Sequence, residues 1–265
     1  MTQPQTMPSP GAPVRYTYHP AAPVAVPAPA PTATPAPTAQ QPQNLYGVHQ
    51  LFADYVAMYE RGMQVSGMSE HPWRRPRFFH LVQMFRLTAG LQGCTAEAGC
   101  YRGLSSYLIC HEQRRADPAF DGSTHVIVDS FEGLSVPTET DGERSRTVQA
   151  RGAFADTSVE HVRRTLSEFP QVTFHKGWIP PVFEQVVERR YRFVHIDVDL
   201  YEPTLAGLRY FMPRMVPGGV LVVDDYGPWP GGEWPGCAVA VHEFARESGA
   251  PFCSLDTGNA VFIKR

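Results

Sequence analysis

The chain has 265 residues and a formal net charge of −3, with acidic and basic residues spread along its length. This balance argues against a nucleic-acid-binding surface, which needs clustered Lys and Arg, and no apolar run is long enough for a membrane span, so we expect neither a nucleic-acid nor a membrane partner. The five cysteines form no CxxC pair and most lie inside apolar runs, which is typical of buried thiols in a reducing compartment, and we therefore expect a cytoplasmic location.

The first part of the chain is a Pro/Ala-rich arm. Twelve of the 26 prolines fall within the first 42 residues, where Leu, Ile and Phe are absent. Because such a stretch buries too little apolar surface to offset the entropy of ordering, we predict that residues 1–43 are disordered, with polyproline II character. The prolines also interrupt every apolar run, so we expect no secretory signal. A passive linker and a docking arm for a partner protein both fit this segment.

The next part, residues 44–92, is predicted to be an N-terminal helical cap. Apolar residues recur at helical spacing within 51–59 and again within 78–89. Between these two stretches lies a basic cluster, residues 71–77, which we interpret as a surface face or a substrate-side patch.

Residues 93–265 have the pattern of one α/β catalytic domain. Short apolar runs alternate with amphipathic segments, which predicts a mostly parallel sheet covered by helices on both faces. A terminal antiparallel hairpin is expected at 252–256 and 260–264, joined by Thr257-Gly258-Asn259. The predicted strands are 94–98, 125–129, 172–175, 192–197 and 219–224, and the predicted helices are 105–115, 158–169, 181–189 and 203–215.

The first predicted strand runs into a segment suited to a cofactor. Ligands of open α/β sheets bind beyond the carboxyl ends of the strands. Gly99 and Gly103 allow the backbone to approach a ligand and begin a helix whose N–H groups face it, while Glu97 offers a carboxylate to an amino group or a ribose. The glycines are four residues apart and follow an acid, unlike GxGxxG, which indicates a cofactor without phosphates. Arg102 and Ser105 in the same segment are further candidates for cofactor binding.

The next two strand ends carry further candidates for cofactor binding. Asp129 is positioned to accept both ribose hydroxyls of a nucleoside, although it could instead cap the turn that follows. Ser130 and Phe131 come directly after it, and Phe131 could cover an adenine. Gly177 and Trp178 follow the third strand, where Trp178 is suited to stack on adenine, but a core or surface tryptophan fits as well.

Four aspartates at the ends of the fourth and fifth strands form the most specific constellation. Carboxylates that converge in one cleft repel and raise one another's pKa unless a cation neutralises them, and oxygen ligands favour Mg²⁺, Mn²⁺ or Ca²⁺. We predict that Asp197, Asp224 and Asp225 bind a divalent metal and that Asp199 is the general base. Any one of these acids could instead cap a helix. We interpret His195 as a hydrogen-bonded core residue rather than a ligand.

With these residues assembled, the sequence resembles the macrocin O-methyltransferase (TylF-like) family of class I S-adenosylmethionine-dependent methyltransferases over about residues 70–265. The resemblance implies a Rossmann-like, seven-stranded, mostly parallel sheet, S-adenosylmethionine as cofactor, Mg²⁺ at the three predicted ligands and Asp199 as base. Members methylate sugar hydroxyls of natural products and several are oligomeric, which allows for a homo-oligomer. The motifs that carry the resemblance are Glu97-Ala-Gly-Cys-Tyr-Arg-Gly, Asp129-Ser-Phe-Glu-Gly-Leu, Lys176-Gly-Trp, Ile196-Asp-Val-Asp-Leu-Tyr-Glu-Pro-Thr204, Pro217-Gly-Gly, Asp224-Asp-Tyr-Gly and Gly236-Cys-Ala-Val-Ala-Val-His-Glu-Phe244.

The sequence therefore predicts a metal-dependent O-methyltransferase that acts on a hydroxyl of a small-molecule acceptor, with residues 135–152 as a lid loop. Val198 stands where the family has Gly or Cys, and Ala238-Val239 where relatives carry Lys, which leaves the substrate open. The alternatives are a metal-independent N-methyltransferase, a non-catalytic interaction protein and an NAD-dependent oxidoreductase, the last of which lacks GxGxxG.

Overall fold

The computed structural model of the chain describes residues 47–227 and 234–265. The predicted arm, residues 1–43, lies outside them. A short 3₁₀ helix, η1 (Gly47–Leu51), precedes α1 (Ala53–Ser66) and α2 (Arg74–Arg86), which fall within the stretch whose spacing predicted helices. No helix in the described ranges is long and apolar enough to cross a membrane.

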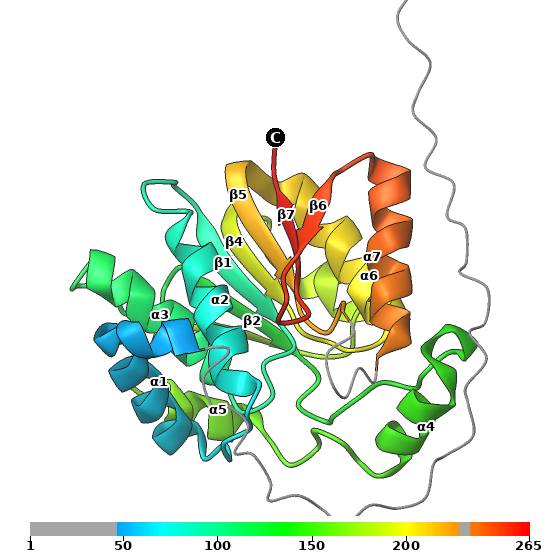
Figure 1. Cartoon of the computed structure of the whole chain (residues 1–265), viewed down its shortest axis with the longest axis horizontal. Coiled ribbons are helices and arrows are strands. Elements are labelled where there is room, and N and C mark those ends of the chain that lie inside the picture. Colours follow the sequence, from blue (N-terminus) through cyan, green and yellow to red (C-terminus); the bar gives the residue numbers. More distant parts are fainter. Residues whose placement is uncertain (1–46, 228–233) are drawn as a thin grey trace, which may run out of the picture. The chain divides into compact units, whose positions relative to one another are not determined.

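The described part of the chain contains one seven-stranded sheet, in the order β3-β2-β1-β4-β5-β7-β6 (Figure 1). The first five strands are parallel, β7 pairs antiparallel with β5, and β6 pairs antiparallel with β7. The predicted α/β fold with a terminal hairpin is therefore confirmed. The strands are β1 (Cys94–Ala98), β2 (His125–Asp129), β3 (Thr173–Lys176), β4 (Tyr191–Ile196), β5 (Met215–Val223), β6 (Phe252–Ser254) and β7 (Ala260–Ile263).

Two predicted connections differ in the structure. The segment 181–189, predicted as a helix, forms only the 3₁₀ helix η3 (Pro181–Gln185), which ends where the β-branched Val186 takes an extended conformation. The predicted lid loop contains η2 (Glu139–Asp141) and α4 (Gly142–Ala150), which begin at a capping box on Thr138. The other helices are α3 (Leu104–Ala116), α5 (Val159–Thr165), α6 (Tyr201–Phe211), η4 (Met212–Arg214) and α7 (Pro235–Ser248).

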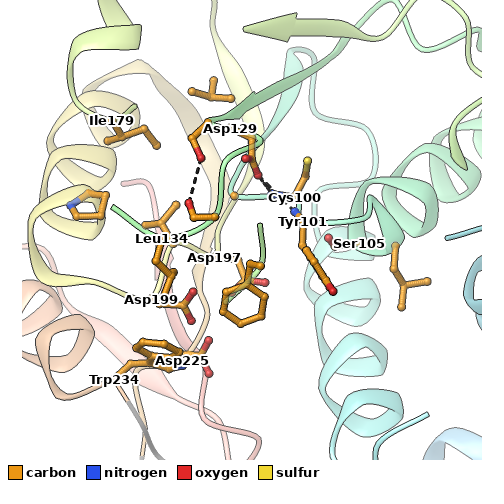
Figure 2. A pocket seen from close by; sticks show the side chains of 18 of the residues that line it. Cys100, Tyr101, Ser105, Asp129, Leu134, Ile179, Asp197, Asp199, Asp225 and Trp234 are labelled. Atoms are coloured by element: carbon orange, nitrogen blue, oxygen red, sulfur yellow. Dashed lines mark hydrogen bonds between the residues drawn. The ribbon is translucent and has the colours of Figure 1, made fainter. Parts of the chain in front are cut away.

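The carboxyl ends of β1, β2, β4 and β5 surround a pocket (Figure 2). Four of the residues that follow these strands have positive φ without being glycine: Tyr101, Phe131, Asp199 and Asp225. Left-handed backbone costs an L-residue roughly 1–2 kcal/mol, and such strain persists where the surrounding structure enforces it, commonly at functional sites. The fold therefore concentrates backbone strain at the edge of the sheet that holds the pocket.

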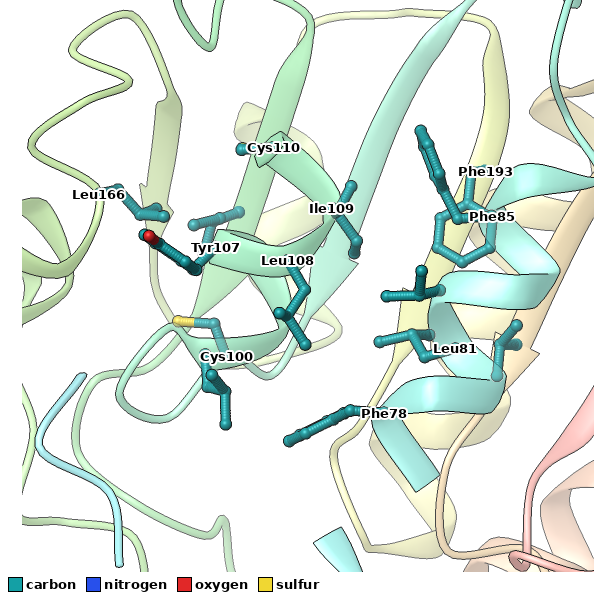
Figure 3. Packing of buried hydrophobic residues seen from close by; sticks show 14 of the residues in the cluster. Phe78, Leu81, Phe85, Cys100, Tyr107, Leu108, Ile109, Cys110, Leu166 and Phe193 are labelled. Carbon is teal, nitrogen blue, oxygen red and sulfur yellow. The ribbon is translucent and has the colours of Figure 1, made fainter. Parts of the chain in front are cut away.

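Alternate residues of the central strands face two separate layers of helices. Phe193 packs with α1, α2 and α3, while its neighbour Val194 packs with α6 and α7, because successive strand residues point to opposite faces. In the first layer Phe85 of α2 meets Phe193 edge to face, with ring centroids 5.3 Å apart (Figure 3). This contact fixes α2 against β4, the strand that leads to the aspartates.

The burial of each cysteine depends on the strand or helix that carries it. Cys100, Cys110 and Cys237 are buried, as predicted. Cys253 is exposed because β6 is the edge strand of the sheet, and Cys94 is only half-buried at the start of β1.

Candidate active site

The pocket is a cavity of about 300 Å³ at the carboxyl edge of the sheet. This volume lies at the lower end of the range for small-molecule sites. Most of the residues predicted for the site line it, whereas Glu97, Arg102, Gly103, Phe131 and Asp224 do not. The predicted residues along its wall are Gly99, Ser105, Asp129, Ser130, Gly177, Trp178, Asp197, Asp199 and Asp225.

Asp129 lies at the cofactor end of the pocket and joins two loops. Its Oδ2 accepts hydrogen bonds from the backbone N–H groups of Cys100 and Tyr101 at 2.6 and 3.3 Å, and its Oδ1 accepts one from Phe131 at 2.6 Å. Burial raises the pKa of the carboxyl, although these hydrogen bonds oppose the rise. Oδ1 keeps acceptor capacity beyond its single bond, which a ligand hydroxyl could use. Asp129 thus both shapes the loop after β1 and faces the cavity.

The two predicted glycines serve backbone packing. A Cβ on Gly99 would stand 1.9 Å from the carbonyl oxygen of Asp197, so only glycine lets the ends of β1 and β4 touch. A Cβ on Gly103 would stand 2.9 Å from Val162 of α5. Both glycines also have positive φ. In this structure the closest atoms to the two Cβ positions belong to Asp197 and Val162, and Gly99 also lines the cavity.

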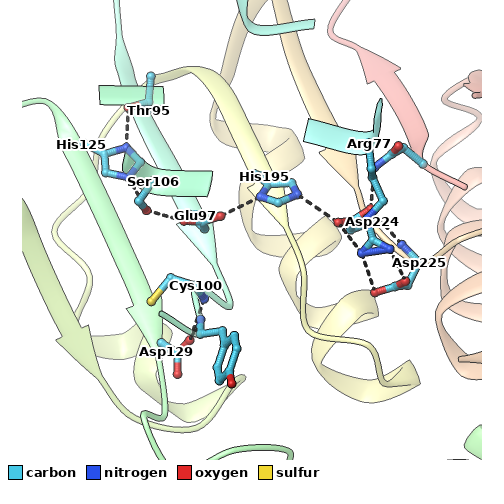
Figure 4. A network of polar contacts seen from close by, with 12 residues as sticks. Arg77, Thr95, Glu97, Cys100, Ser106, His125, Asp129, His195, Asp224 and Asp225 are labelled. Atoms are coloured by element: carbon cyan, nitrogen blue, oxygen red, sulfur yellow. Dashed lines mark hydrogen bonds and ion pairs between the residues drawn. The ribbon is translucent and has the colours of Figure 1, made fainter. Parts of the chain in front are cut away.

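Glu97 does not reach the cavity. It is fully buried, and its Oε1 lies 2.7 Å from His195 Nδ1 while its Oε2 accepts a hydrogen bond from Ser106 (Figure 4). Burial opposes ionisation, but His195 and the neighbouring serines outweigh it and lower the pKa of the carboxyl. Its predicted contact with a cofactor is therefore corrected to a contact with His195, because β1 and β4 pair Glu97 with His195.

Two other predicted cofactor residues point elsewhere. Arg102 donates to the carbonyl of Gly67 and to Asp156, at 2.8 and 2.7 Å. Phe131 is buried in the first helix layer, near Phe174. Both therefore support the walls of the site without lining it.

The four aspartates come together as predicted, but they divide into two overlapping sets. The ligand atoms of His195, Asp197 and Asp224 lie within 4.8 Å of one another, and so do those of Asp197, Asp199 and Asp225. Asp197 belongs to both sets, and the predicted trio is split between them. The second set lines the cavity, whereas Asp224 lies beneath it.

Arg77 is the residue that the sequence interpretation missed. It comes from α2, and its Nη2 lies 2.9 Å from Asp224 Oδ2 while its Nη1 lies 3.0 Å from Asp225 Oδ1. The sequence analysis placed it in a basic cluster interpreted as a surface face or a substrate-side patch; its side chain is only 17% exposed and lines the cavity. The available signal was its position directly before the apolar pair Phe78-Phe79, which places it at the edge of a buried helix face.

The charges in this cluster are not balanced. Burial, together with Asp224 and Asp225, raises the pKa of Asp197 well above its usual range, and burial together with Asp225 and Asp197 does the same for Asp199. For Asp224, Arg77 and His195 outweigh the effect of burial and lower the pKa. Burial opposes the charged form of His195, but the carboxylates of Asp224 and Glu97 outweigh it and raise its pKa to about 10, so His195 adds a second positive charge beside Arg77. Two positive charges still leave the four aspartates and Glu97 with excess negative charge, and oxygen donors of this kind fit a hard divalent cation.

The backbone aims Asp199 at the cavity. Asp199 has φ of 62°, and the N–H of Leu200 donates to the carbonyl of Val198 at 2.6 Å, which closes a tight three-residue turn around it. The next residue, Tyr201, donates its N–H to Asp141 Oδ1 at 2.6 Å. Asp141 belongs to η2, so the segment predicted as a lid is fastened to the turn that holds Asp199.

An aromatic wall completes the cavity. Tyr101, Phe154 and Trp234 line it, with the rings of Tyr101 and Phe154 edge to face at 5.3 Å. Trp73 and Arg74 from the N-terminal helices line the same cavity. Sequence spacing offered no means to place Tyr101, Phe154 and Trp234, because they come from three separate connections.

The family profile described as macrocin O-methyltransferase (TylF) matches residues 75–265. The chain is 29% identical over 187 residues to 8-demethyl-8-(2,3-dimethoxy-alpha-L-rhamnosyl)-tetracenomycin-C 4'-O-methyltransferase of Streptomyces olivaceus, a match that covers 66% of this chain and 67% of that protein. It is also 29% identical over 173 residues to mycinamicin III 3''-O-methyltransferase of Micromonospora griseorubida, covering 62% and 64%. The chain thus spans about two thirds of the length of these relatives.

Solved structures agree with the sequence match. The O-methyltransferase NovP superposes with a TM-score of 0.58 at 25% identity, covering 71% of this chain and 79% of that one. A calicheamicin methyltransferase superposes with a TM-score of 0.59 at 18% identity, covering 80% and 93%, which shows a shared fold. The chain therefore belongs to the macrocin O-methyltransferase (TylF) family, and the prediction that it is an O-methyltransferase of this family is confirmed.

Proposed function

We propose that the protein transfers a methyl group from S-adenosylmethionine to a sugar hydroxyl of a natural product, with a divalent cation at the aspartate cluster. The observation that carries the proposal is a single cavity that holds Asp129 at one end and Asp197, Asp199 and Asp225 at the other. A nucleoside cofactor and a cation-bound acceptor need these two kinds of group side by side.

At the cofactor end, Asp129 would accept a ribose hydroxyl with its remaining lone pairs. Ser130, Gly177 and Trp178 line the same end, and Trp178, which is 39% exposed, offers its ring to adenine. Ser105 lies where α3 begins. Glu97 supports this end only through His195, and Gly99 only through the approach of β1 to β4.

At the acceptor end, the cation would be held by Asp197 together with Asp224 and Asp225. Because Arg77 bridges the last two, it must release or share one of them when this ligand set forms. When bound, S-adenosylmethionine supplies an electrophilic methyl group on a sulfonium, and the cation supplies positive charge that acidifies and orients the acceptor hydroxyl. Mg²⁺ suits the carboxylate ligands.

Asp199 would accept the proton of the reacting hydroxyl. The new bond joins the hydroxyl oxygen to the methyl carbon, the carbon–sulfur bond breaks, and the electron pair stays on sulfur as S-adenosylhomocysteine. The tight turn around Asp199 and the bond from Tyr201 to Asp141 hold the carboxylate toward the cavity.

The acceptor class rests on the relatives. Their names specify hydroxyls of a rhamnosyl tetracenomycin and of mycinamicin III. An aromatic wall formed by Phe154 and Trp234 is suited to pack against sugar C–H groups. We expect no nucleic-acid partner. A cytoplasmic location and a homo-oligomer stay predictions.

Two measurements test the proposal. Calorimetry with S-adenosylhomocysteine and with NADH should give binding only for the first. The variant Asp197→Ala should lose turnover of a glycosylated acceptor while it keeps S-adenosylhomocysteine affinity within about twofold. Binding of NADH alone would indicate an oxidoreductase, and full turnover by the variant would remove the cation from the proposal.

A further inference from the structure

Arg74 carries a guanidinium on the cavity wall that no carboxylate of the described chain neutralises. Arg74 and Arg77 both line the cavity. Arg77 is held by two aspartates at 2.9 and 3.0 Å, whereas Arg74 forms no ion pair within residues 47–227 and 234–265 and donates instead to the carbonyl of Ser69. Because a guanidinium has five donors and stays charged in proteins, Arg74 is suited to bind an anionic group of a ligand.

Three residues of α2 face the cavity together, because Arg74, Arg77 and Phe78 are spaced three and four positions apart. Arg77 reaches the aspartates that follow β5. Phe78 belongs to the buried cluster that contains Cys100, from the loop that follows β1 (Figure 3). Arg74 comes one turn before both residues and extends this wall, which joins the aspartate end of the cavity to the loop after β1.

The connection between α1 and α2 rests on that loop. The carbonyl of Gly67 in the connection accepts a hydrogen bond from Arg102 Nη1 at 2.8 Å, and Arg74 donates to a second carbonyl of the same connection. Two backbone N–H groups of the loop donate to Asp129, the residue proposed for the ribose. The loop after β1 thus links the ribose end of the cavity to the connection that holds Arg74.

The sulfonium of S-adenosylmethionine has three substituents, and each needs its own direction. When the cofactor binds as proposed, its adenosyl group extends to Asp129 and its methyl group faces the acceptor at the aspartate cluster. The methionyl group is then left with the remaining wall, which includes Met68, Arg74, Leu104 and Ser105. That group ends in an ammonium and a carboxylate, and Arg74 is the charged residue among these four.

The carboxylate of the methionyl group needs a cation, because the cavity is acidic. Four aspartates line it: Asp129, Asp197, Asp199 and Asp225. A carboxylate brought among them is repelled, and its desolvation costs free energy unless it is paired and hydrogen-bonded. An arginine meets both needs, since its planar fork can donate two parallel hydrogen bonds to one carboxylate.

We propose that Arg74 binds the α-carboxylate of S-adenosylmethionine, an inference that rests on the proposed function. Arg74 holds the methionyl end of the cofactor while Asp129 holds the ribose, and the two contacts together orient the sulfur that lies between them. The contact also makes the site selective, because an adenosyl ligand without the carboxylate leaves the guanidinium unpaired. Arg74 is therefore a specificity-determining residue for the cofactor.

Calorimetry on the full chain tests this with S-adenosylhomocysteine and its decarboxylated analogue, which keeps the adenosyl and amino groups. The wild type should bind S-adenosylhomocysteine at least about tenfold more tightly than the analogue. Arg74→Gln should lower S-adenosylhomocysteine affinity about 10–100-fold, the range for a hydrogen bond to a charged group, and keep the affinity for the analogue within about twofold. Arg74→Lys, which keeps the charge but not the planar fork, should recover part of the loss.

Arg75→Gln is the matched control. Arg75 is the next residue of α2, but it pairs with Glu60 and Glu70 at 3.3 and 3.2 Å and does not line the cavity. Both ligands should bind this variant as they bind the wild type. In turnover, Arg74→Gln should raise the KM for S-adenosylmethionine and leave the KM for a rhamnosylated acceptor unchanged.

Equal affinity of the wild type for the two ligands overturns the inference and leaves the proposed function intact, since both ligands then occupy a nucleoside site. The inference also fails if Arg74→Gln keeps its S-adenosylhomocysteine affinity, or if it raises the KM of the acceptor alone, which assigns the guanidinium to the acceptor. Failure of the wild type to bind either ligand overturns both proposals. Because the first comparison uses only the wild type, it does not depend on the variants folding.

Discussion

Replacing Gly99 with alanine tests whether the site depends on direct contact between the ends of β1 and β4. A Cβ at this position would stand 1.9 Å from the Asp197 carbonyl oxygen and 2.9 Å from Val198 Cγ1, whereas real Cβ contacts stay beyond 3.0 Å. The backbone of Asp197 must therefore move by about 1 Å, and metal geometry tolerates only about 0.2 Å. We expect a large loss of turnover with the fold retained.

The stability change follows from two contributions. Alanine at φ of +82° costs about 1–2 kcal/mol, and crowding in a packed region costs about 1–3 kcal/mol more. Gly249→Ala is the matched control, because Gly249 has φ of +67° and no atom within 4 Å of its Cβ position. Urea denaturation of both variants should show Gly99→Ala to be the less stable by at least about 1 kcal/mol. Equal stability and full activity of the two variants would show that the site does not depend on the contact between the ends of β1 and β4.

Three further outcomes are expected. Asp129→Ala should weaken S-adenosylhomocysteine binding at least tenfold in calorimetry and leave Mn²⁺ affinity unchanged; weakened binding of both would point to general collapse. Gly236→Ala places a Cβ 1.9 Å from Asp141 Oδ1, so it should break the bond to Tyr201 and lower kcat without changing S-adenosylhomocysteine affinity. Burial lowers the pKa of His125 from 6.5 to about 4, so the unfolded chain takes up the proton first. The contribution of His125 to stability should therefore fall by about 1.4 kcal/mol per pH unit between pH 6.5 and about 4, and urea midpoints of His125→Gln should show a shallower fall there; parallel curves would contradict this.

The sheet was predictable because its signals are local. The strands β2, β4 and β5 contain short apolar runs, with Asp129 at the end of β2 and Asp197 directly after β4. Once the strand order is assumed, the aspartates of β4 and β5 must meet at one edge. The turn sequence Thr257-Gly258-Asn259 predicted the antiparallel end hairpin. In the structure the N–H of Leu255 donates to the carbonyl of Asn259 across this turn.

The partners inside the site were not predictable, because they depend on contacts between distant segments. Arg77 and Asp225 are 148 positions apart, and no local pattern links them. The partner of Glu97 was equally unpredictable, because only the register of β1 against β4 places Glu97 beside His195 and away from the cavity. A carboxylate at a strand end looks the same in sequence whether it faces a ligand or a neighbouring strand.

Within the predicted lid segment, the loop assignment was wrong for a different reason. Polar composition between residues 135 and 152 was interpreted as loop, yet Thr138 and Asp141 form a capping box that starts η2 and α4. Asp141 then accepts the N–H of Tyr201, and Gly236 leaves the room for its carboxylate. The segment is thus anchored to α6 by a residue whose role only the packed structure reveals.

Cation-dependent methyl transfer to a sugar hydroxyl is tested most directly by following a labelled methyl group from S-adenosylmethionine to a rhamnosylated acceptor. The protein is first stripped of metal by a chelator and then given Mg²⁺ or Mn²⁺. We predict no labelled product in the stripped protein and restored transfer when the ion is added back. Undiminished transfer by the stripped protein would contradict the claim.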